Sequence, residues 1–209
     1  MNVKTHSILS IILAAIMICG LSDSSLAGRG DLKGKQTGEE EKLTLSQTEA
    51  DTLTFMREEE KLARDVYLVM FASWGTKIFS NIAVSEQNHM DAIKTLLDKY
   101  GLPDPAYQGI GVFNDPSLQE LYEQLENQGK ISKLDAFMVG ALIEEIDIED
   151  LQTAIDQTDK QDLQRVYENL MSGSENHLRS FVSQIERLGV NYNAQYLPPR
   201  VVDEILAEK

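Results

Sequence analysis

Two histidines lie in short segments of similar sequence, and both segments contain residue types that bind metals. The first segment is SEQNHM (85–90) and the second is GSENHL (173–178). Glu86 precedes His89 by three residues, a spacing that places both side chains on one face of a helix. A single inward histidine is more often an ordinary core residue. The repeated pattern instead predicts that His89 and His177 are metal ligands, because imidazole and carboxylate groups together suit transition metals.

Both histidines fall on apolar stripes at helical spacing. The first stripe is Ile82, Glu86, His89, Ile93 and Leu96, and the second is Leu170, Ser174, His177, Phe181 and Ile185. A carboxylate in an apolar stripe is costly unless it is paired or bound to a metal. We therefore expect Glu86 to face the interior and to contact a cation there.

A carboxylate ligand is also expected from the helix that precedes Glu86. Three consecutive glutamates, Glu58, Glu59 and Glu60, lie in the amphipathic segment that begins near residue 46. Apolar residues three, four or seven positions from Glu59 place it on the inward face. The pattern predicts Glu59 as the ligand and directs Glu58 and Glu60 toward solvent.

A further carboxylate is expected from the segment 133–157, where Glu144 and Glu145 are adjacent. Each of them has apolar residues on its own helical face, so the spacing does not separate them. Glu145 is the preferred ligand, Glu144 remains open, and Asp147 is a weaker alternative.

Composition limits the classes of function. The chain has 209 residues, of which 34 are acidic and 19 basic, and its formal charge is −15. We do not expect this acidic chain to bind nucleic acid, because contact with phosphates needs a basic face. The single cysteine excludes an internal disulfide framework and an all-cysteine metal site.

The first residues have the pattern of a secretory signal peptide. Lys4 is followed by an apolar stretch that is short for a membrane span, and small residues precede a cleavage position after Ala27. We expect residues 1–27 to be removed, leaving no stable membrane anchor and a periplasmic or secreted protein. The alternative is a retained anchor. Residues 28–45 are rich in glycine and charge and are expected to form a flexible leader.

The remaining chain predicts an all-α fold. Helices are expected over about 46–74, 77–100, 133–157 and 160–188, with a short helix at 117–128 and another at 201–207. Short turns make the first and second pairs of long helices antiparallel hairpins. A connection of about thirty residues joins the hairpins, which is the arrangement of a ferritin-like four-helix bundle with one long crossover over 46–188. Residues 189–209 form a C-terminal tail.

Four segments carry a resemblance to a known group: MREEEKLARDVY (56–67), SEQNHMDAI (85–93), GALIEEIDIEDL (140–151) and GSENHLRSF (173–181). They resemble an uncharacterised bacterial and archaeal family of the ferritin-like superfamily. That resemblance implies the ligand order Glu, Glu-x-x-His, Glu, Glu-x-x-His around two iron or manganese ions. In this sequence the order corresponds to Glu59, Glu86 with His89, Glu145 or Glu144, and His177.

The sequence departs from that order three residues before His177, where Ser174 stands in place of glutamate. Glu175 points sideways because one residue turns a helix by about 100°. Glu149 or water is a candidate to fill the gap. An asymmetric di-metal site or a single-metal site is therefore also compatible with the sequence.

The expected function follows from this ligand set. Iron, most readily as a di-iron site, would bind and react with oxygen or peroxide, as in a ferroxidase or peroxidase-like oxidoreductase. Manganese and zinc are the alternative metals for this ligand set. The alternative is a metal-free helical interaction module in which Lys61 and Arg64 hold the inward glutamates. A homodimer is a general expectation for helical bundles.

Overall fold

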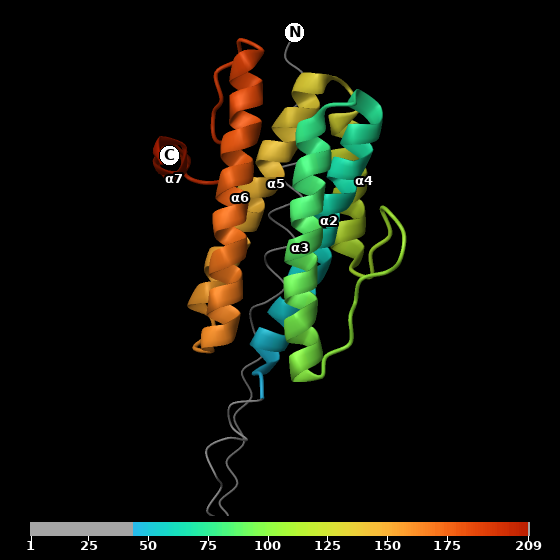
Figure 1. Cartoon of the computed structure of the whole chain (residues 1–209), viewed down its shortest axis with the longest axis vertical. Helices are drawn as coiled ribbons and strands as arrows, with labels where there is room; N and C mark the ends of the chain where they lie inside the picture. The colour runs from blue at the N-terminus through green and yellow to red at the C-terminus, as the bar shows by residue number, and fades with distance from the viewer. Residues whose placement is uncertain (1–43, 209) are drawn as a thin grey trace, which may run out of the picture.

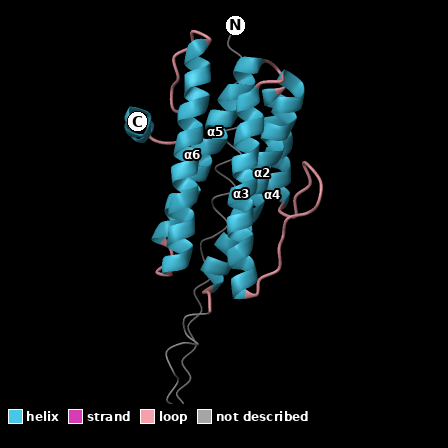
Figure 2. Ribbon diagram, viewed as in Figure 1, coloured by secondary structure: helices cyan, strands magenta, loops and turns pink. Residues whose placement is uncertain are grey.

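The described part of the chain, residues 44–208 of a computed structural model, is all-helical and has no strand (Figure 2). Its helices are α2 (Gln47–Trp74), α3 (Lys77–Tyr100), α4 (Pro116–Gly129), α5 (Lys133–Asp156), α6 (Gln161–Arg187) and α7 (Pro199–Ala207). The all-α prediction is confirmed, and the predicted helices begin and end close to these positions. The predicted signal peptide (1–27) and most of the predicted leader (28–45) lie outside the described residues.

The ends of α2 follow from local sequence. The side chain of Ser46 accepts a hydrogen bond from the backbone of Glu49, and the side chain of Glu49 accepts one from the backbone of Ser46. This capping box starts the helix where the sequence predicts it. Gly75 ends the helix in the left-handed conformation, with φ of 62°. A glycine adopts this conformation without steric cost, so the chain turns tightly into α3.

The long helices form two antiparallel pairs, α2 with α3 and α5 with α6 (Figure 1). Residues 101–115 leave the end of α3 and run outside the helices to α4. Helix α4 packs against both α2 and α5, and the two pairs also meet through α2 with α5 and α3 with α6. The connection between the pairs therefore covers one side of the long helices.

Burial extends around almost the whole circumference of α2 and α5. Glu58 and Glu60 are 3% and 1% exposed, so the expectation that they point to solvent is wrong. The physical reason is that α3, α4 and α5 all pack against α2 and leave little of its surface free. Helix α5 is covered by α2, α4 and α6, and Ala141 to Ile148 are all buried.

The apolar core is divided into two clusters by a polar layer. One cluster contains Val66 and Ile82, and the other contains Leu53 and Ile93. On α3, Glu86 and His89 lie between the residues of the two clusters in sequence. The same order occurs on α2 and α6, whereas on α5 Glu144 lies among residues of the first cluster. The fold therefore brings polar residues from four helices to one level of the interior.

Among the described helices, none has a stretch that is both long enough and apolar enough to cross a membrane.

Candidate metal centre

Five side chains from four helices meet in the polar layer. They are Glu60 from α2, Glu86 and His89 from α3, Glu144 from α5 and His177 from α6, and we call them the central cluster. The three glutamates are at most 2% exposed, and the two histidines are 9% exposed. Ionised carboxylates at this depth need partners, because burial removes their hydration.

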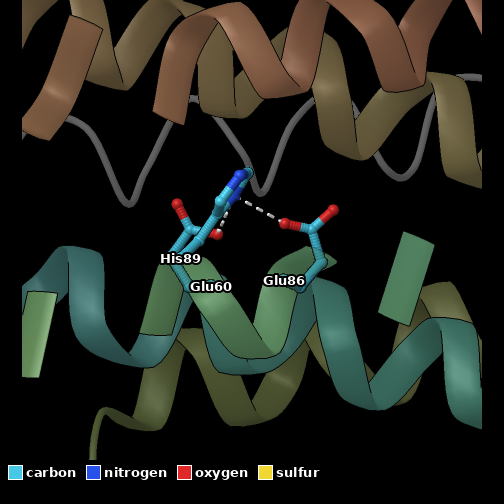
Figure 3. Close-up of side chains that lie close together, drawn as sticks. All are labelled: Glu60, Glu86 and His89. Carbon is cyan, nitrogen blue, oxygen red and sulfur yellow. Dashed lines mark hydrogen bonds and ion pairs between the residues drawn. The ribbon is translucent and has the colours of Figure 1, made fainter. Parts of the chain in front are cut away.

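The first half of the central cluster is formed by α2 and α3. The Nδ1 atom of His89 lies 2.8 Å from Oε2 of Glu86 and 3.2 Å from Oε2 of Glu60 (Figure 3). The ligand atoms of these three residues all lie within 4.8 Å of one another. A metal ion bound between them would have two carboxylates and one imidazole as ligands.

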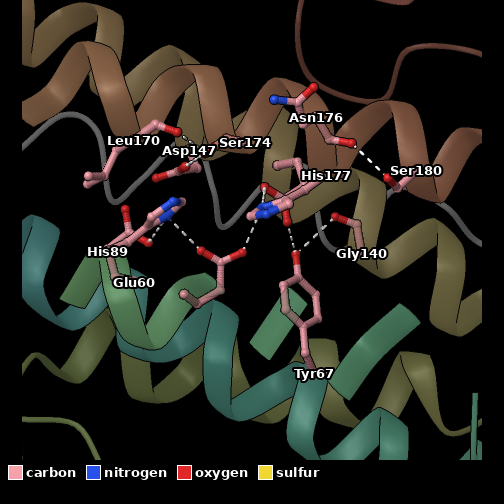
Figure 4. A network of polar contacts seen from close by, with 12 residues as sticks. Glu60, Tyr67, His89, Gly140, Asp147, Leu170, Ser174, Asn176, His177 and Ser180 are labelled. Atoms are coloured by element: carbon pink, nitrogen blue, oxygen red, sulfur yellow. Dashed lines mark hydrogen bonds and ion pairs between the residues drawn. The ribbon is translucent and has the colours of Figure 1, made fainter. Parts of the chain in front are cut away.

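The second half adds α5 and α6 and shares Glu86 with the first. The Nδ1 atom of His177 lies 2.8 Å from Oε1 of Glu86 and 3.4 Å from Oε2 of Glu144 (Figure 4). Glu86, Glu144 and His177 also bring ligand atoms within 4.8 Å of one another. The centres of the two imidazole rings are 5.7 Å apart. Each oxygen of Glu86 thus faces a different histidine.

Several atoms of the central cluster approach one another without a hydrogen bond. Oε1 of Glu86 and Nδ1 of His177 are buried and lack hydrogen-bond geometry despite their 2.8 Å separation. Oε1 of Glu60 is also buried without a hydrogen-bond partner. Buried polar atoms in native proteins are nearly always satisfied, so these atoms call for a partner that the protein itself does not provide.

The electrostatics of the shared carboxylate differ from those of its neighbours. Burial alone would raise the pKa of Glu86, but contacts with His177 and His89 lower it to about 2. Burial would lower the pKa values of the two histidines, yet their glutamate partners raise them to about 11 for His89 and about 10 for His177. Without a metal, protons on the imidazoles therefore take the place of cations.

The negative charges of the other two glutamates, Glu60 and Glu144, are only partly compensated by the histidines. Burial raises the pKa of Glu60 to about 7, although the hydrogen bond with His89 opposes this shift. Burial likewise raises the pKa of Glu144, with His177 opposing and Glu86 reinforcing the shift. The three carboxylates of the central cluster, when ionised, carry more negative charge than two protonated histidines neutralise. A divalent ion would neutralise this excess.

Basic side chains nearby are engaged elsewhere. Nζ of Lys61 lies 2.5 Å from Asp65, and Arg64 lies 2.7 Å from the same carboxylate. Within the described chain, none of the ion pairs made by lysine or arginine involves the glutamates of the central cluster. The donor set therefore fits divalent metal ions better than it fits an internal salt-bridge network.

Asp147 and Ser174 occupy the edge of the central cluster (Figure 4). The hydroxyl of Ser174 donates a hydrogen bond to Oδ2 of Asp147, and both residues are buried. Glu149, a residue considered for the gap left by Ser174, is exposed and does not reach the interior. The carboxylate beside Ser174 is thus that of Asp147.

Glu59 lies beside the central cluster rather than among its five members. It is 7% exposed, and burial together with Asp150 and Asp147 raises its pKa well above the ordinary value. Glu59 and Asp147 line a cavity of about 20 Å³ whose other walls are apolar side chains of α2, α4 and α5. That volume accommodates about one water molecule.

Glu145 faces away from the central cluster and holds the C-terminal tail. Its carboxylate accepts hydrogen bonds from the backbone N–H groups of Gln195, Tyr196 and Leu197, at 2.6 to 3.1 Å, and from the hydroxyl of Tyr192. The structure therefore brings Glu144, not Glu145, to Glu86 and His177.

Two further residues support the central cluster. The hydroxyl of Tyr67 donates a hydrogen bond of 2.5 Å to Oε1 of Glu144. Gly173 packs so closely on His89 that an added Cβ atom would lie 2.7 Å from its Nε2. Tyr67 lies on the same helix as Glu60, seven residues later, whereas no helical periodicity marks Gly173 of α6 as a neighbour of His89.

Comparison with known proteins places the chain in a family. The model of an uncharacterized protein domain, DUF2202, matches residues 49–209. The chain belongs to the DUF2202 family. This DUF2202 domain includes nearly all of α2, every later helix and all members of the central cluster.

The relatives of this DUF2202 chain cover most of its length. Uncharacterized protein MJ0754 of Methanocaldococcus jannaschii is 50% identical over 167 residues, which are 79% of this chain and 90% of that protein. The crystal structure of hypothetical protein MJ0754 from Methanococcus jannaschii has a TM-score of 0.75 and 48% identity, and it covers 86% of this chain and 99% of the other. The helical domain is therefore similar to a domain solved by experiment.

Proposed function

We propose that this DUF2202 protein is a ferritin-like metal protein that binds two divalent ions, iron or manganese, in the central cluster. The observation that carries the proposal is the position of Glu86, whose two oxygens each lie 2.8 Å from a different histidine. A carboxylate that serves two separate imidazoles at this spacing is suited to bridge two ions. Its neighbours Glu60 and Glu144 supply one further carboxylate on each side.

The arrangement of the helices supports the ferritin-like part of the proposal. Two antiparallel pairs are joined by one long connection, and the ligands come from four different helices. Di-metal bundles of this kind use a glutamate from two helices and a Glu-x-x-His pair from the other two. Here α2 offers Glu60, α3 offers Glu86 with His89, α5 offers Glu144, and α6 offers His177 without a glutamate.

The residues of the chain would hold and shield the ions in distinct ways. Glu60 with His89 would hold one ion, Glu144 with His177 the other, and Glu86 would contact both. The apolar clusters on either side exclude water, and Tyr67 fixes the orientation of Glu144 through its hydrogen bond. Bound iron or manganese would supply one-electron redox chemistry toward oxygen or peroxide.

Metal binding would also release protons. In the metal-free protein the pKa values of His89 and His177 lie at about 11 and about 10, so both imidazoles carry two protons at neutral pH. An imidazole must be neutral to bind a metal through Nδ1. Loading the site with metal would therefore release protons from His89 and His177.

The metal content of two variants tests the proposal. Wild-type protein, the double variant His89→Ala/His177→Ala and the control Glu175→Gln are loaded with Fe(II) under anaerobic conditions, desalted and analysed for iron. Glu175 lies on α6 near His177 but outside the central cluster. We expect two iron ions per chain in the wild type and the control and none in the double variant. Equal iron in all three proteins would sink the proposal.

The presence of Ser174 motivates a second candidate function, a helical interaction module that has lost its metal. In this candidate the protonated histidines alone would balance the glutamates. The two candidates differ in their thermal stability, since a ligand of the native state raises the melting temperature. The first predicts a higher melting temperature with Mn(II) than without it. The second predicts no change.

We also propose that the protein acts outside the cytoplasm. The proposal rests on the sequence of residues 1–27, which has the charge, apolar stretch and cleavage position of a signal peptide. Sequencing the N-terminus of protein isolated from its native cells tests it. A first residue at position 28 is expected, and a retained residue 1 or 2 would contradict the proposal.

A further inference from the structure

The two halves of the central cluster differ in one carboxylate. Glu86 stands three residues before His89 on α3, and Ser174 stands three residues before His177 on α6. Spacing of three places each residue on the same helical face as its histidine. The side chain that faces Glu86 across the cluster from α6 is thus a hydroxyl rather than a carboxylate.

Granting the two-ion proposal above, on which this inference rests, we propose that Asp147 of α5 supplies the missing carboxylate. Asp147 then becomes a further metal ligand of the centre, and Ser174 becomes the residue that positions it. The hydroxyl of Ser174 donates its hydrogen bond to Oδ2 of Asp147, so the carboxylate lies where a side chain from position 174 would extend.

The free oxygen of Asp147 is the first support for this assignment. Asp147 is 6% exposed, and its Oδ1 atom is buried without a hydrogen-bond partner. Its other oxygen is held by Ser174, which is fully buried. One oxygen is therefore fixed and the other is left available, which is the state expected of a metal ligand with an oriented partner.

The position of Asp147 along α5 is the second support. Glu144 and Asp147 are separated by three residues, so they share one face of α5, as Glu86 and His89 share one face of α3. Figure 4 shows Asp147 together with Ser174 at the edge of the central cluster, and the hydrogen bond between them fixes this position.

Charge balance is the third support. With Asp147 included, the centre contains four carboxylates, Glu60, Glu86, Glu144 and Asp147, and two neutral imidazoles. Two divalent cations match the charge of four ionised carboxylates. A buried site that is neutral overall avoids the cost of an uncompensated charge in the interior.

Binding of Mn(II), measured by calorimetry and by metal analysis, tests the assignment. In Asp147→Asn, which keeps the shape of the side chain but removes its charge, we expect one of the two bound ions to be lost. In Ser174→Ala, which keeps Asp147 but frees it, we expect both ions at an affinity about tenfold lower for one of them.

Two control variants test whether metal binding depends on a carboxylate at the position of Asp147 or on any buried carboxylate nearby. Glu59→Gln removes another buried carboxylate beside Asp147 and should retain two ions. The double variant Asp147→Ser/Ser174→Glu moves the carboxylate to α6 and should recover both ions. Paramagnetic resonance of the bound Mn(II) gives a second readout, because two coupled ions and one isolated ion have different spectra.

The outcomes distinguish this inference from the proposed function. Two ions at wild-type affinity in Asp147→Asn would overturn the role of Asp147 while leaving the two-ion centre intact. If Asp147→Asn does not fold, Ser174→Ala decides, and unchanged affinity for both ions overturns the role of the pair. A wild-type protein that binds no Mn(II) would overturn the two-ion centre and this inference together.

Discussion

Glu144 and Glu145 are neighbours on α5, and both are buried, yet they have opposite surroundings. Glu145 accepts hydrogen bonds from three backbone N–H groups and one hydroxyl of the C-terminal tail. Glu144 accepts one from Tyr67 and otherwise faces Glu86 and His177. The carboxylate of Glu145 is satisfied by the protein alone, whereas the carboxylate of Glu144 lies among other acids.

The same contrast occurs on α2. Glu58 accepts hydrogen bonds from the backbone of Asn114 at 2.6 Å and of Asp115 at 2.9 Å, and so fixes the connection that leads into α4. Glu60, two residues away, has a buried oxygen without a partner. Each helix thus carries one glutamate that anchors a loop and one that faces the central cluster. Burial alone therefore does not mark a ligand: Glu58 and Glu145 are satisfied by backbone donors, whereas Glu60 and Glu144, which face the central cluster, have few donors.

The largest expected effect on stability belongs to the anchoring glutamate of α5. Glu145→Ala leaves the donors of Gln195, Tyr196 and Leu197 without their acceptor, and we expect a loss of about 2 to 4 kcal/mol in the free energy of unfolding. Urea unfolding of the metal-free protein measures this loss. The variant should still bind two Mn(II) ions per folded chain. A folded variant that has lost metal would contradict the conclusion that Glu144, and not Glu145, is a ligand.

Substitution of the neighbouring Glu144 is expected to have the opposite pattern, with little effect on stability and a clear effect on metal content. Glu144→Gln removes one negative charge from a buried acidic cluster, so the metal-free protein should lose less than about 1 kcal/mol or gain stability. Its metal content should fall, since one ligand of the second ion is gone. Comparison with Glu145→Gln, made side by side, sharpens the result. Equal metal content in both variants would contradict the assignment of roles.

The pH dependence of the metal-free protein should reflect the central cluster. The pKa values of His89 (about 11), His177 (about 10) and Glu60 (about 7) are above their ordinary values of 6.5 and 4.5, so the folded state holds more protons. Their stabilising contribution is complete below those ordinary values and is lost as pH rises through the folded ones. Glu86, lowered to about 2, contributes above pH 4.5 and loses its effect as pH falls toward 2.

We therefore expect the free energy of unfolding of the metal-free protein to fall as pH rises from about 6.5 to 9. Saturating Mn(II) should reverse or flatten this slope, because metal binding displaces protons and strengthens with pH. Urea titrations at several pH values, with chelator and with Mn(II), measure both slopes. Parallel slopes in the two conditions would show that the ions and the protons do not compete for the same residues.

The smallest expected effect on metal binding belongs to Tyr67. Tyr67→Phe removes the hydrogen bond to Glu144 and keeps the aromatic packing against Phe79 and Phe181. We expect a loss of about 1 kcal/mol in stability and weaker binding of one ion, with two ions still bound at saturation. Calorimetry with Mn(II) checks this, and complete loss of an ion would mean that Tyr67 has a larger role than orientation.

The sequence predicted the helices and the convergence of His89, His177 and Glu86 because these features depend on local periodicity. It did not separate Glu144 from Glu145, because α5 is buried on nearly all sides and both residues have apolar neighbours. It predicted that Glu58 and Glu60 face solvent because their contacts, of Glu58 with the residues before α4 and of Glu60 with His89 of α3, are tertiary and have no local signal. The contact between Asp147 and Ser174 joins residues 27 positions apart and was equally inaccessible.

Anomalous scattering from crystals loaded with Mn(II) tests the central claim most directly. We expect two peaks on opposite sides of the Glu86 carboxylate, one near Glu60 and His89 and the other near Glu144 and His177. Absence of both peaks from the central cluster of a fully loaded crystal, or peaks confined to surface carboxylates, would contradict it.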